Sequence, residues 1–261
     1  MFTELRLSVC IPTFNRSEQV TSLVEQMLSV QGAFEICVHD DGSSDDTSAR
    51  LSQIKDARLR VSKGPNRGRG QALQAAIQMA QGQFVMLFDD DDVLYPDGLR
   101  AVLIECGRSL PQNCLGWIYQ LEDNEGVRVG SAFPVAQANF IELRADYNVT
   151  GDKKEVVKRT ALIEAINVPG KARRVPTSLY WSRLARTGDV LCMDRIIGRK
   201  NYLEGGMSDR IRGLKSSNPY PLYLLARARM LAFISGCYRS PWFLLRSLAA
   251  FLYYGVRARI Q

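Results

Sequence analysis

The stretch FVMLFDDDDVLYP, residues 84–96, runs from five apolar residues into four consecutive carboxylates, Asp89 to Asp92. At a separation of ~5 Å and an effective dielectric of about 20, each pair of like charges repels by roughly 3 kcal/mol. A divalent cation would offset this repulsion, and carboxylate oxygens suit Mg²⁺ or Mn²⁺ bridged to the phosphates of a substrate. The alternative interpretation is a solvated acidic turn, or an acidic cluster favoured at the start of a helix.

The segment HDDGSSDDT, residues 39–47, supplies two further acids, Asp40 and Asp41, beside a glycine that lets the backbone pass close to a ligand. A carboxylate at this position can accept a hydrogen bond from a base N–H and so select a nucleobase. The same segment is also typical of a turn that caps a helix through Ser44 or Asp45. These two interpretations concern different residues and are compatible.

The segment NRGRGQALQAAI, residues 66–77, places two glycines at a predicted helix start with Arg67 and Arg69 beside them. Backbone N–H groups and cationic side chains in this arrangement suit a diphosphate. The chain has no GxxxxGK[ST] motif, and no GxGxxG follows its first predicted strand. Both absences disfavour a P-loop NTPase and a nicotinamide-dependent enzyme.

The elements that must position these residues alternate between strand and helix. Such alternation predicts an α/β fold with a mostly parallel central sheet and helices on both faces, in which ligands bind outside the carboxyl ends of the strands. Because PTFN and the three polar segments above each follow a predicted strand, we expect them to meet at one edge. The predicted strands are 5–11, 34–39, 58–62, 83–88 and 115–121, the predicted helices are about 17–30, 45–55, 69–80 and 96–108, and 122–150 is expected to be loop-rich.

Composition restricts the class of protein. The chain has 261 residues, 46% of them hydrophobic, which is enough for one main core. Its six cysteines show no metal-binding spacing, and its single histidine, His39, argues against a histidine-based triad or a multi-histidine metal site. The first 15 residues contain no signal-peptide core, so we expect a cytoplasmic protein.

The net charge of +7 is unevenly distributed. All 27 acids lie in residues 1–209, whereas residues 210–261 hold nine Lys and Arg and no acid. We therefore expect a catalytic domain at 1–209, with a nucleotide-binding half at 1–105 and an acceptor-side half at 106–209, followed by a helical tail at 210–261. The tail is apolar and aromatic with arginines at intervals, which favours a helix lying on anionic lipid. The alternative is a helix pair packed on the domain with an exposed basic face; nucleic-acid binding is disfavoured because no recognition module accompanies the charge.

Three segments, SVCIPTFNR, EICVHDDGSSDDT and NRGRGQALQAAIQMAQGQFVMLFDDDDVLYP, together resemble the consecutive motifs of family 2 glycosyltransferases over about residues 5–105. The resemblance implies a GT-A fold and a nucleotide-sugar donor, with UDP as the expected nucleotide. It implies that Asp41 reads the base, that Asp89 and Asp90 lie near the ribose and the metal, and that Asp91 holds Mg²⁺ or Mn²⁺ on the diphosphate. The remaining expected donor-binding residues are Pro12, Thr13, Phe14, Asn66 and Arg67.

The second half is similar, more loosely, to bacterial members with a GDKxEV segment, here Gly151–Val156, and a later PExLxW segment. This chain has Thr177 where that segment has glutamate. An inverting transferase needs a base to deprotonate the acceptor hydroxyl, and a threonine hydroxyl cannot serve at neutral pH. Asp152, Glu155 and Asp194 are the substitutes that the sequence offers, with Asp152 preferred. The alternative for GDKKE is a helix start capped by Asp152.

These observations predict a metal-dependent transferase that moves a sugar from a nucleotide-sugar to a lipid-linked saccharide at the inner face of the plasma membrane, in cell-surface polysaccharide synthesis. The first alternative, motivated by Thr177, is a donor-binding or scaffold protein of the same fold. The second is a haloacid-dehalogenase-like phosphatase, since VMLFDDDDV fits the hhhhDxDx[TV] pattern, although three β-α units precede it here. A nucleotidyltransferase is disfavoured because PTFNR, not a Gly-rich loop, follows the first strand.

Overall fold

The computed structural model describes residues 5–168, 175–201 and 219–260, and it is built around one nine-stranded sheet. The strand order is β3-β2-β1-β4-β8-β6-β9-β5, and β7 pairs with β9 off this path. In chain order the strands are β1 (Leu7–Thr13), β2 (Phe34–Asp40), β3 (Leu59–Lys63), β4 (Phe84–Leu87), β5 (Val93–Leu94), β6 (Cys114–Glu122), β7 (Gln137–Ala138), β8 (Lys154–Lys158) and β9 (Asp189–Arg199).

The N-terminal half of the sheet is parallel, as the alternation of strand and helix predicts. Strands β3, β2, β1 and β4 pair in parallel, so their carboxyl ends share one edge of the sheet. Strands β1 and β4 are wholly buried, in keeping with their uninterrupted apolar sequences. The connecting helices are α1 (Ser17–Leu28), α2 (Thr47–Gln53) and α3 (Arg69–Met79).

The second half makes the sheet mixed. Strand β8 runs antiparallel between β4 and β6, β6 and β9 are parallel, and β5 and β7 are antiparallel to β9. Because β8 is antiparallel to β4, it begins where β4 ends. Residue Lys154 therefore starts its strand beside the acidic run, and the idea that GDKKE opens a helix is wrong.

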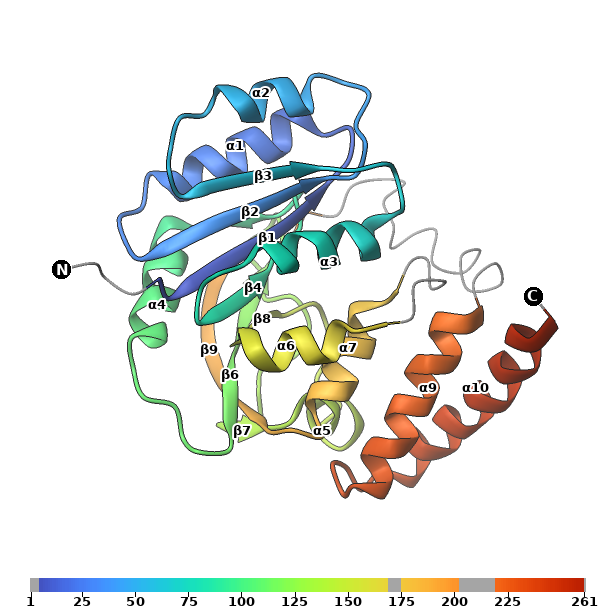
Figure 1. The fold of residues 1–261 in the computed structure, drawn as a ribbon. Helices are drawn as coiled ribbons and strands as arrows, with labels where there is room; N and C mark the ends of the chain where they lie inside the picture. The colour runs from blue at the N-terminus through green and yellow to red at the C-terminus, as the bar shows by residue number, and fades with distance from the viewer. Residues whose placement is uncertain (1–4, 169–174, 202–218, 261) are drawn as a thin grey trace.

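Helices cover both faces of the sheet, as predicted (Figure 1). The two faces carry separate hydrophobic clusters, one containing Val24 of α1 and Leu99 of α4, the other Leu73 of α3 and Leu179 of α7. Gly98 of α4 packs against β9 so closely that a Cβ there would meet the Ile197 carbonyl oxygen at 2.1 Å. The helices of this half are α4 (Pro96–Cys106), α5 (Phe140–Ala145), α6 (Arg159–Ile166) and α7 (Thr177–Leu184).

The C-terminal segment forms two helices, α9 (Pro219–Ile234) and α10 (Pro241–Ile260), that pack against each other (Figure 1). Helix α9 also packs on α7, and the turn between α9 and α10 is held where the backbone N–H groups of Arg239 and Ser240 each donate to Asp146 at 2.8 Å. None of the helices in the described part of the chain combines the length and the apolar composition that crossing a bilayer requires. The expected domain boundary between residues 209 and 210 lies outside the described residues.

Candidate active site

The carboxyl ends of the parallel strands bring the predicted donor-binding segments together. Pro12 and Thr13 are the last residues of β1 and are buried, whereas the ring of Phe14 is 41% exposed just beyond the strand. Next to it, Asn15 connects two segments: its N–H donates to Ser43 Oγ at 2.9 Å, and its side-chain oxygen accepts from the Ser44 N–H at 2.8 Å. The PTFN and DDGSS segments therefore form one hydrogen-bonded rim.

Asp41 fastens this rim to the third polar segment. One carboxylate oxygen accepts the Arg67 N–H at 2.8 Å and the other accepts the Gly68 N–H at 2.7 Å. Gly42 has a φ of 82°, and a Cβ there would lie 2.8 Å from the Asn66 nitrogen, so the two loops touch through backbone. The side chains of Asn66 and Arg67 remain exposed. Recognition of a base by Asp41 stays a prediction. In the structure, Asp41 also holds two loops together through its backbone hydrogen bonds.

Asp40 is fully buried at the end of β2 and has a different role. Its carboxylate accepts hydrogen bonds from the Ser43 N–H at 2.7 Å and from the Ser48 hydroxyl, and Lys63 Nζ lies 3.5 Å away. Burial acts to raise the pKa of Asp40, but these hydrogen bonds outweigh it and lower the pKa. Asp40 is thus an ionised anchor of the turn that leads to α2.

The four acids after β4 are neutralised by cations from distant parts of the chain. The sequence suggests that a divalent cation offsets their repulsion; within the described residues, basic side chains already do so. Strand β5 separates the run from α4, so these acids do not start a helix. The pairs are Arg16 with Asp90 and Asp91, Arg69 with Asp89, Lys154 with Asp89 and Asp92, and Lys200 with Asp89 and Asp92.

The environments of neighbouring acids in this run differ. Burial raises the pKa of Asp90 to about 6, although Arg16 acts against this rise. Burial also acts to raise the pKa of Asp89, but Arg69 and two lysines hold that pKa well below its usual range. Asp89 is therefore ionised at neutral pH. Asp90 titrates about one pH unit below neutrality.

Asp90 and Asp91 are suited to a shared cation. Oδ1 of Asp90 and Oδ2 of Asp91 both lie 2.7 Å from Nη1 of Arg16, so two carboxylate oxygens converge on one positive centre. No group of three or more His, Cys, Asp or Glu residues is placed to hold a metal among the described residues. A cation here would take one or two carboxylates and complete its shell with phosphate and water, which is typical of Mg²⁺. The donor set fits a metal that arrives with a diphosphate.

The candidate bases occupy three different environments. Asp152 precedes β8; its side chain is 60% exposed and lies 3.8 Å from Lys200 Nζ, which contacts the acidic run. Glu155 is buried in β8, and burial raises its pKa to about 7. Asp194 is 61% exposed on β9, near Gln120 and Arg128. Thr177 is the first residue of α7. Only Asp152 of these acids is both exposed and one side chain away from the acidic run.

Sequence reasoning missed three cations of this site. Arg16 stands in the quoted PTFNR motif, and Lys154 stands in GDKKEV, so both had a signal in their neighbours. Lys200 had none, because it is 111 residues from Asp89 and reaches it only through the pairing of β9 in the sheet.

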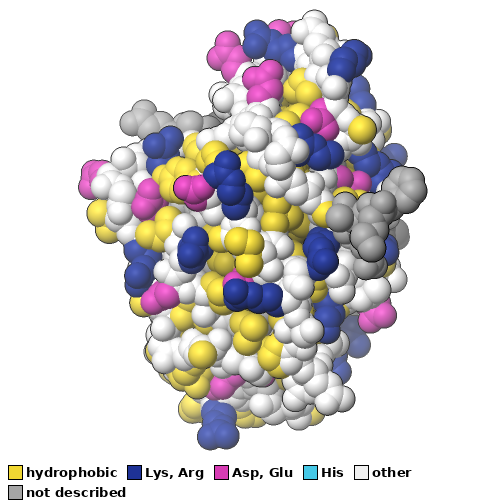
Figure 2. Space-filling model, turned by 90° about the vertical axis from the view of Figure 1, so that its left-hand side faces the viewer, with side chains coloured by type: hydrophobic (Ala, Val, Ile, Leu, Met, Phe, Trp, Pro, Cys, Tyr) yellow, Lys and Arg dark blue, Asp and Glu magenta, His cyan; other side chains and the backbone are white. Residues whose placement is uncertain are grey.

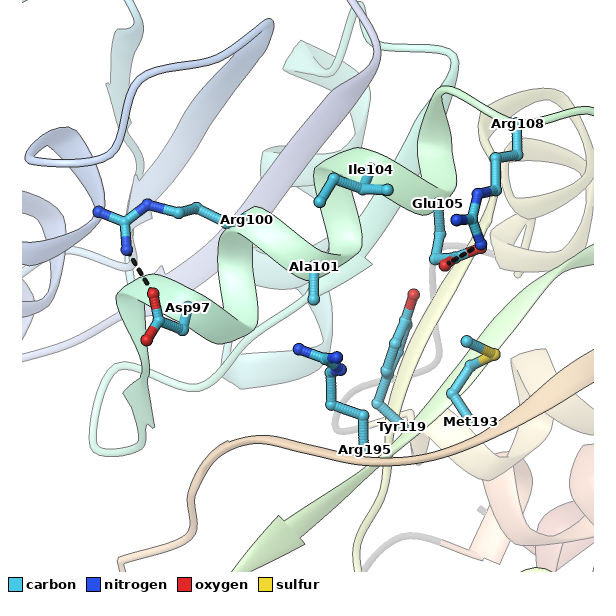
Figure 3. A pocket seen from close by; sticks show the side chains of 9 residues that line it. All are labelled: Asp97, Arg100, Ala101, Ile104, Glu105, Arg108, Tyr119, Met193 and Arg195. Atoms are coloured by element: carbon cyan, nitrogen blue, oxygen red, sulfur yellow. Dashed lines mark hydrogen bonds and ion pairs between the residues drawn. The ribbon is translucent and has the colours of Figure 1, made fainter.

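A hollow of about 430 Å³ lies elsewhere, between α4, β6 and β9 (Figure 3). The Arg100–Asp97 and Arg108–Glu105 ion pairs line it, and the ring of Tyr119 stands between α4 and β9. Figure 2 views the molecule from the side of α4, and its basic and acidic side chains are interspersed with hydrophobic ones. This hollow contains none of the predicted site residues.

Comparison with known proteins identifies the family. The profile described as "Glycosyl transferase family 2" matches residues 8–153, more than half of the chain and the whole of the rim and acidic run. The chain belongs to glycosyl transferase family 2. The predictions of this family and of a transferase are confirmed. The family match excludes the phosphatase and nucleotidyltransferase alternatives.

Curated members of the family match parts of the chain. A chondroitin synthase of Escherichia coli is 30% identical over 130 residues, 49% of this chain and 19% of that protein. The succinoglycan biosynthesis protein ExoO of Rhizobium meliloti is 34% identical over 95 residues, 36% of this chain and 27% of that protein. A GalNAc(5)-diNAcBac-PP-undecaprenol beta-1,3-glucosyltransferase of Campylobacter jejuni is 30% identical over 122 residues, 42% of this chain and 38% of that protein. The match therefore spans less than half the length of each relative.

Solved structures match nearly the whole chain. S. aureus TarS 1-349 in complex with UDP has a TM-score of 0.67 and 18% identity, covering 95% of this chain and 70% of that chain. The mannosyltransferase PcManGT from Pyrobaculum calidifontis, in complex with GDP-Man and Mn²⁺, has a TM-score of 0.59 and 17% identity, covering 98% of this chain and 76% of that chain. These likenesses confirm the predicted GT-A fold.

Proposed function

We propose that this protein transfers a sugar from a UDP-sugar to a saccharide acceptor carried on a lipid, in the assembly of a cell-surface polysaccharide. The observation that carries the proposal is the convergence of Asp90 and Asp91 on one cationic position beside the rim built by Asp41. Two comparisons support the donor and the acceptor: TarS is solved with UDP, and the C. jejuni relative is named for an undecaprenol-linked acceptor.

On the donor side, Phe14 offers an exposed ring at the rim for the nucleoside, and Asp41 holds the segment around Asn66 and Arg67 through its hydrogen bonds to the backbone. Arg16 can exchange its carboxylate partners for the diphosphate, because its side chain is 30% exposed. Asp91 is the metal ligand we propose, and the bound Mg²⁺ or Mn²⁺ would stabilise the charge that develops on the leaving diphosphate.

On the acceptor side, we assign the role of base to Asp152. A base must accept the proton of the attacking hydroxyl while that hydroxyl faces the anomeric carbon. Asp152 is exposed and lies next to Lys200, which also contacts Asp89 and so connects the base to the donor site. Glu155 is the second choice, because its pKa of about 7 suits a base but its burial restricts access to it.

The lipid-linked acceptor implies a place of action at a membrane. We propose a peripheral position on the cytoplasmic face of the plasma membrane, where the basic segment at 210–261 contacts the surface. No nucleic-acid partner is proposed.

The test measures UDP binding by titration calorimetry with and without Mn²⁺. Asp91→Ala should lose the metal-dependent part of the UDP affinity and all sugar transfer, because the variant lacks the proposed metal ligand. Asp97→Ala, an acid that is 88% exposed on α4, serves as the matched control and should behave as the unaltered protein does. Full metal-dependent binding in the Asp91 variant contradicts the proposal.

A second candidate function is donor binding without catalysis, and it is favoured by Thr177 in place of an acid. Thermal shift with a panel of nucleotide sugars and Mn²⁺ identifies the donor under either candidate, because a ligand of the folded state raises apparent stability. Hydrolysis or transfer of the bound donor distinguishes them. A donor that binds and is never consumed, with acceptor present, would favour the scaffold.

A further inference from the structure

The helix pair at the C-terminal end leaves one side of α10 uncovered. The other side packs on α9: the rings of Phe251 and Tyr223 stack at 5.0 Å, and the Arg229 guanidinium lies 5.0 Å from the centre of the Phe243 ring. Ten residues between 241 and 258 are exposed, and eight of these are apolar or aromatic. The eight are Pro241, Trp242, Leu245, Leu248, Ala249, Leu252, Tyr253 and Val256, and the other two are Arg246 and Arg257.

Five of the exposed residues form a continuous row along the helix, which we name the α10 stripe: Trp242, Leu245, Ala249, Leu252 and Val256. Their spacing of three and four residues places them on one face of an α-helix. Trp242 is 68% exposed and Val256 is 63% exposed, so the stripe is open along its length. A helix on a protein surface in water normally turns polar residues outward, and α10 does the reverse.

The charges around the stripe have one sign. The described residues from 219 to 258 include five arginines and no acid. Arg246 and Arg257 are exposed beside the stripe, and the Arg257 guanidinium lies 5.0 Å from the centre of the Tyr253 ring. Apolar side chains with flanking arginines and interfacial aromatic rings are the composition of a helix that lies in the plane of an anionic lipid surface.

We infer that the α10 stripe inserts among the headgroups of an anionic membrane, with Arg246 and Arg257 on lipid phosphates. The inference deepens, and rests on, the membrane location proposed above, and it names the surface responsible. A second copy of this chain fits the stripe less well. Two stripes packed together would bring like-charged arginines close, with no acid on either α10 to pair with them.

The position of α10 in the molecule suits this contact. Helix α10 lies at an edge of the molecule in Figure 1, with α9 between it and α7, and its C-terminal end is on the side toward which β1 and β2 run. That side also holds the carboxyl ends of the strands and the acidic run. The C-terminal end of α10 and the acidic run therefore lie toward the same side of the molecule.

Vesicle co-sedimentation of the full chain tests the inference. The probes are vesicles of phosphatidylcholine alone and of phosphatidylcholine with an equal amount of phosphatidylglycerol. We expect binding to the anionic vesicles, and loss of at least about tenfold in affinity for Trp242→Ser with Leu252→Ser, since two large apolar contacts are removed. Arg246→Gln with Arg257→Gln should lose about fivefold per arginine on anionic vesicles. The matched control is Ile104→Ser with Val127→Ser, which removes side chains that are 59% and 56% exposed elsewhere.

Two results overturn the inference. One is equal vesicle binding by the stripe variant and the control. The other is absence of vesicle binding together with a dimer in light scattering that Trp242→Ser with Leu252→Ser dissociates, which assigns the stripe to a second copy. The same variants should bind UDP with Mn²⁺ as the unaltered protein does. Vesicle binding without UDP binding would refute the proposed transferase function but not the membrane contact of the α10 stripe.

Discussion

Replacing Lys154 with methionine removes the most buried of the cations that pair with the acidic run and keeps most of the length of the side chain. Lys154 Nζ lies 2.9 Å from Asp92 and 3.4 Å from Asp89, and 4.5 Å from the centre of the Phe88 ring. Its side chain is 6% exposed and that of Asp92 is 0% exposed. The variant therefore leaves a carboxylate in the protein interior with Lys200 as its remaining cation and the Asn201 N–H as a further donor.

The size of the effect follows from these distances. At an effective dielectric of about 20, each of the two attractions is worth about 5 kcal/mol before the cost of desolvating the charges. Breaking a buried ion pair by removing one partner typically costs about 3–5 kcal/mol, because the other charge stays buried. Since Lys200 still neutralises part of the charge on Asp92, we expect a loss of about 3 kcal/mol in the free energy of unfolding.

Urea unfolding at pH 7 measures this loss, and Lys158→Met is the matched control. Lys158 lies on the same face of β8, is half-buried, and makes no ion pair within the described part of the chain. Mn²⁺ should bind Lys154→Met more tightly than the unaltered protein, because the acids have lost a competing cation. Equal stability of the two variants would refute the view that basic side chains neutralise the acidic run.

Three further predictions concern single acids of the site. Asp41→Asn should lower the free energy of unfolding by about 2–4 kcal/mol in urea unfolding, since one backbone N–H loses its acceptor. Asp97→Asn is the exposed control, and equal losses in the two variants would contradict the structural role of Asp41. Burial raises the pKa of Glu155, so the stability that Glu155 contributes falls as pH rises from about 4.5 to about 7. In urea unfolding, Glu155→Gln should be as stable as the unaltered protein at pH 4.5 and more stable at pH 8. The same change of stability with pH in both proteins would refute this. Asp152→Asn should lower the turnover of sugar transfer by about 10²–10⁴-fold with UDP affinity unchanged; unaltered turnover would pass the role to Glu155.

The proposed donor half of the candidate site could be predicted because the information that positions it is local in the sequence. The strand ending at Leu87 and the four acids after it are neighbours in sequence, and the same holds for Thr13 and for Asp40. Parallel β-α units bring consecutive strand ends to one edge without any further knowledge of packing. The partner of Asp41 was not predictable in this way, since its contacts are to backbone N–H groups 26 and 27 residues later.

The proposed acceptor half carried less information in its sequence. The pairing of β8 between β4 and β6 reverses the direction of the sheet, and no periodicity in GDKKEV reveals an antiparallel neighbour. The exposure of Asp152 and the burial of Glu155, three residues apart, follow from the start of that strand. The choice between these two acids therefore needed the tertiary structure.

The sequence by itself determined the family, the order of the first four strands' polar ends and the excess of arginine after residue 210, because each depends on residue type and short-range spacing. The tertiary structure decided which charges meet. Arg16, Lys154 and Lys200 come from three separate parts of the chain, and the sheet brings them to the four acids that follow β4. The tertiary structure also decided which side of α10 faces outward, because one apolar face packs on α9 and the other is exposed to solvent.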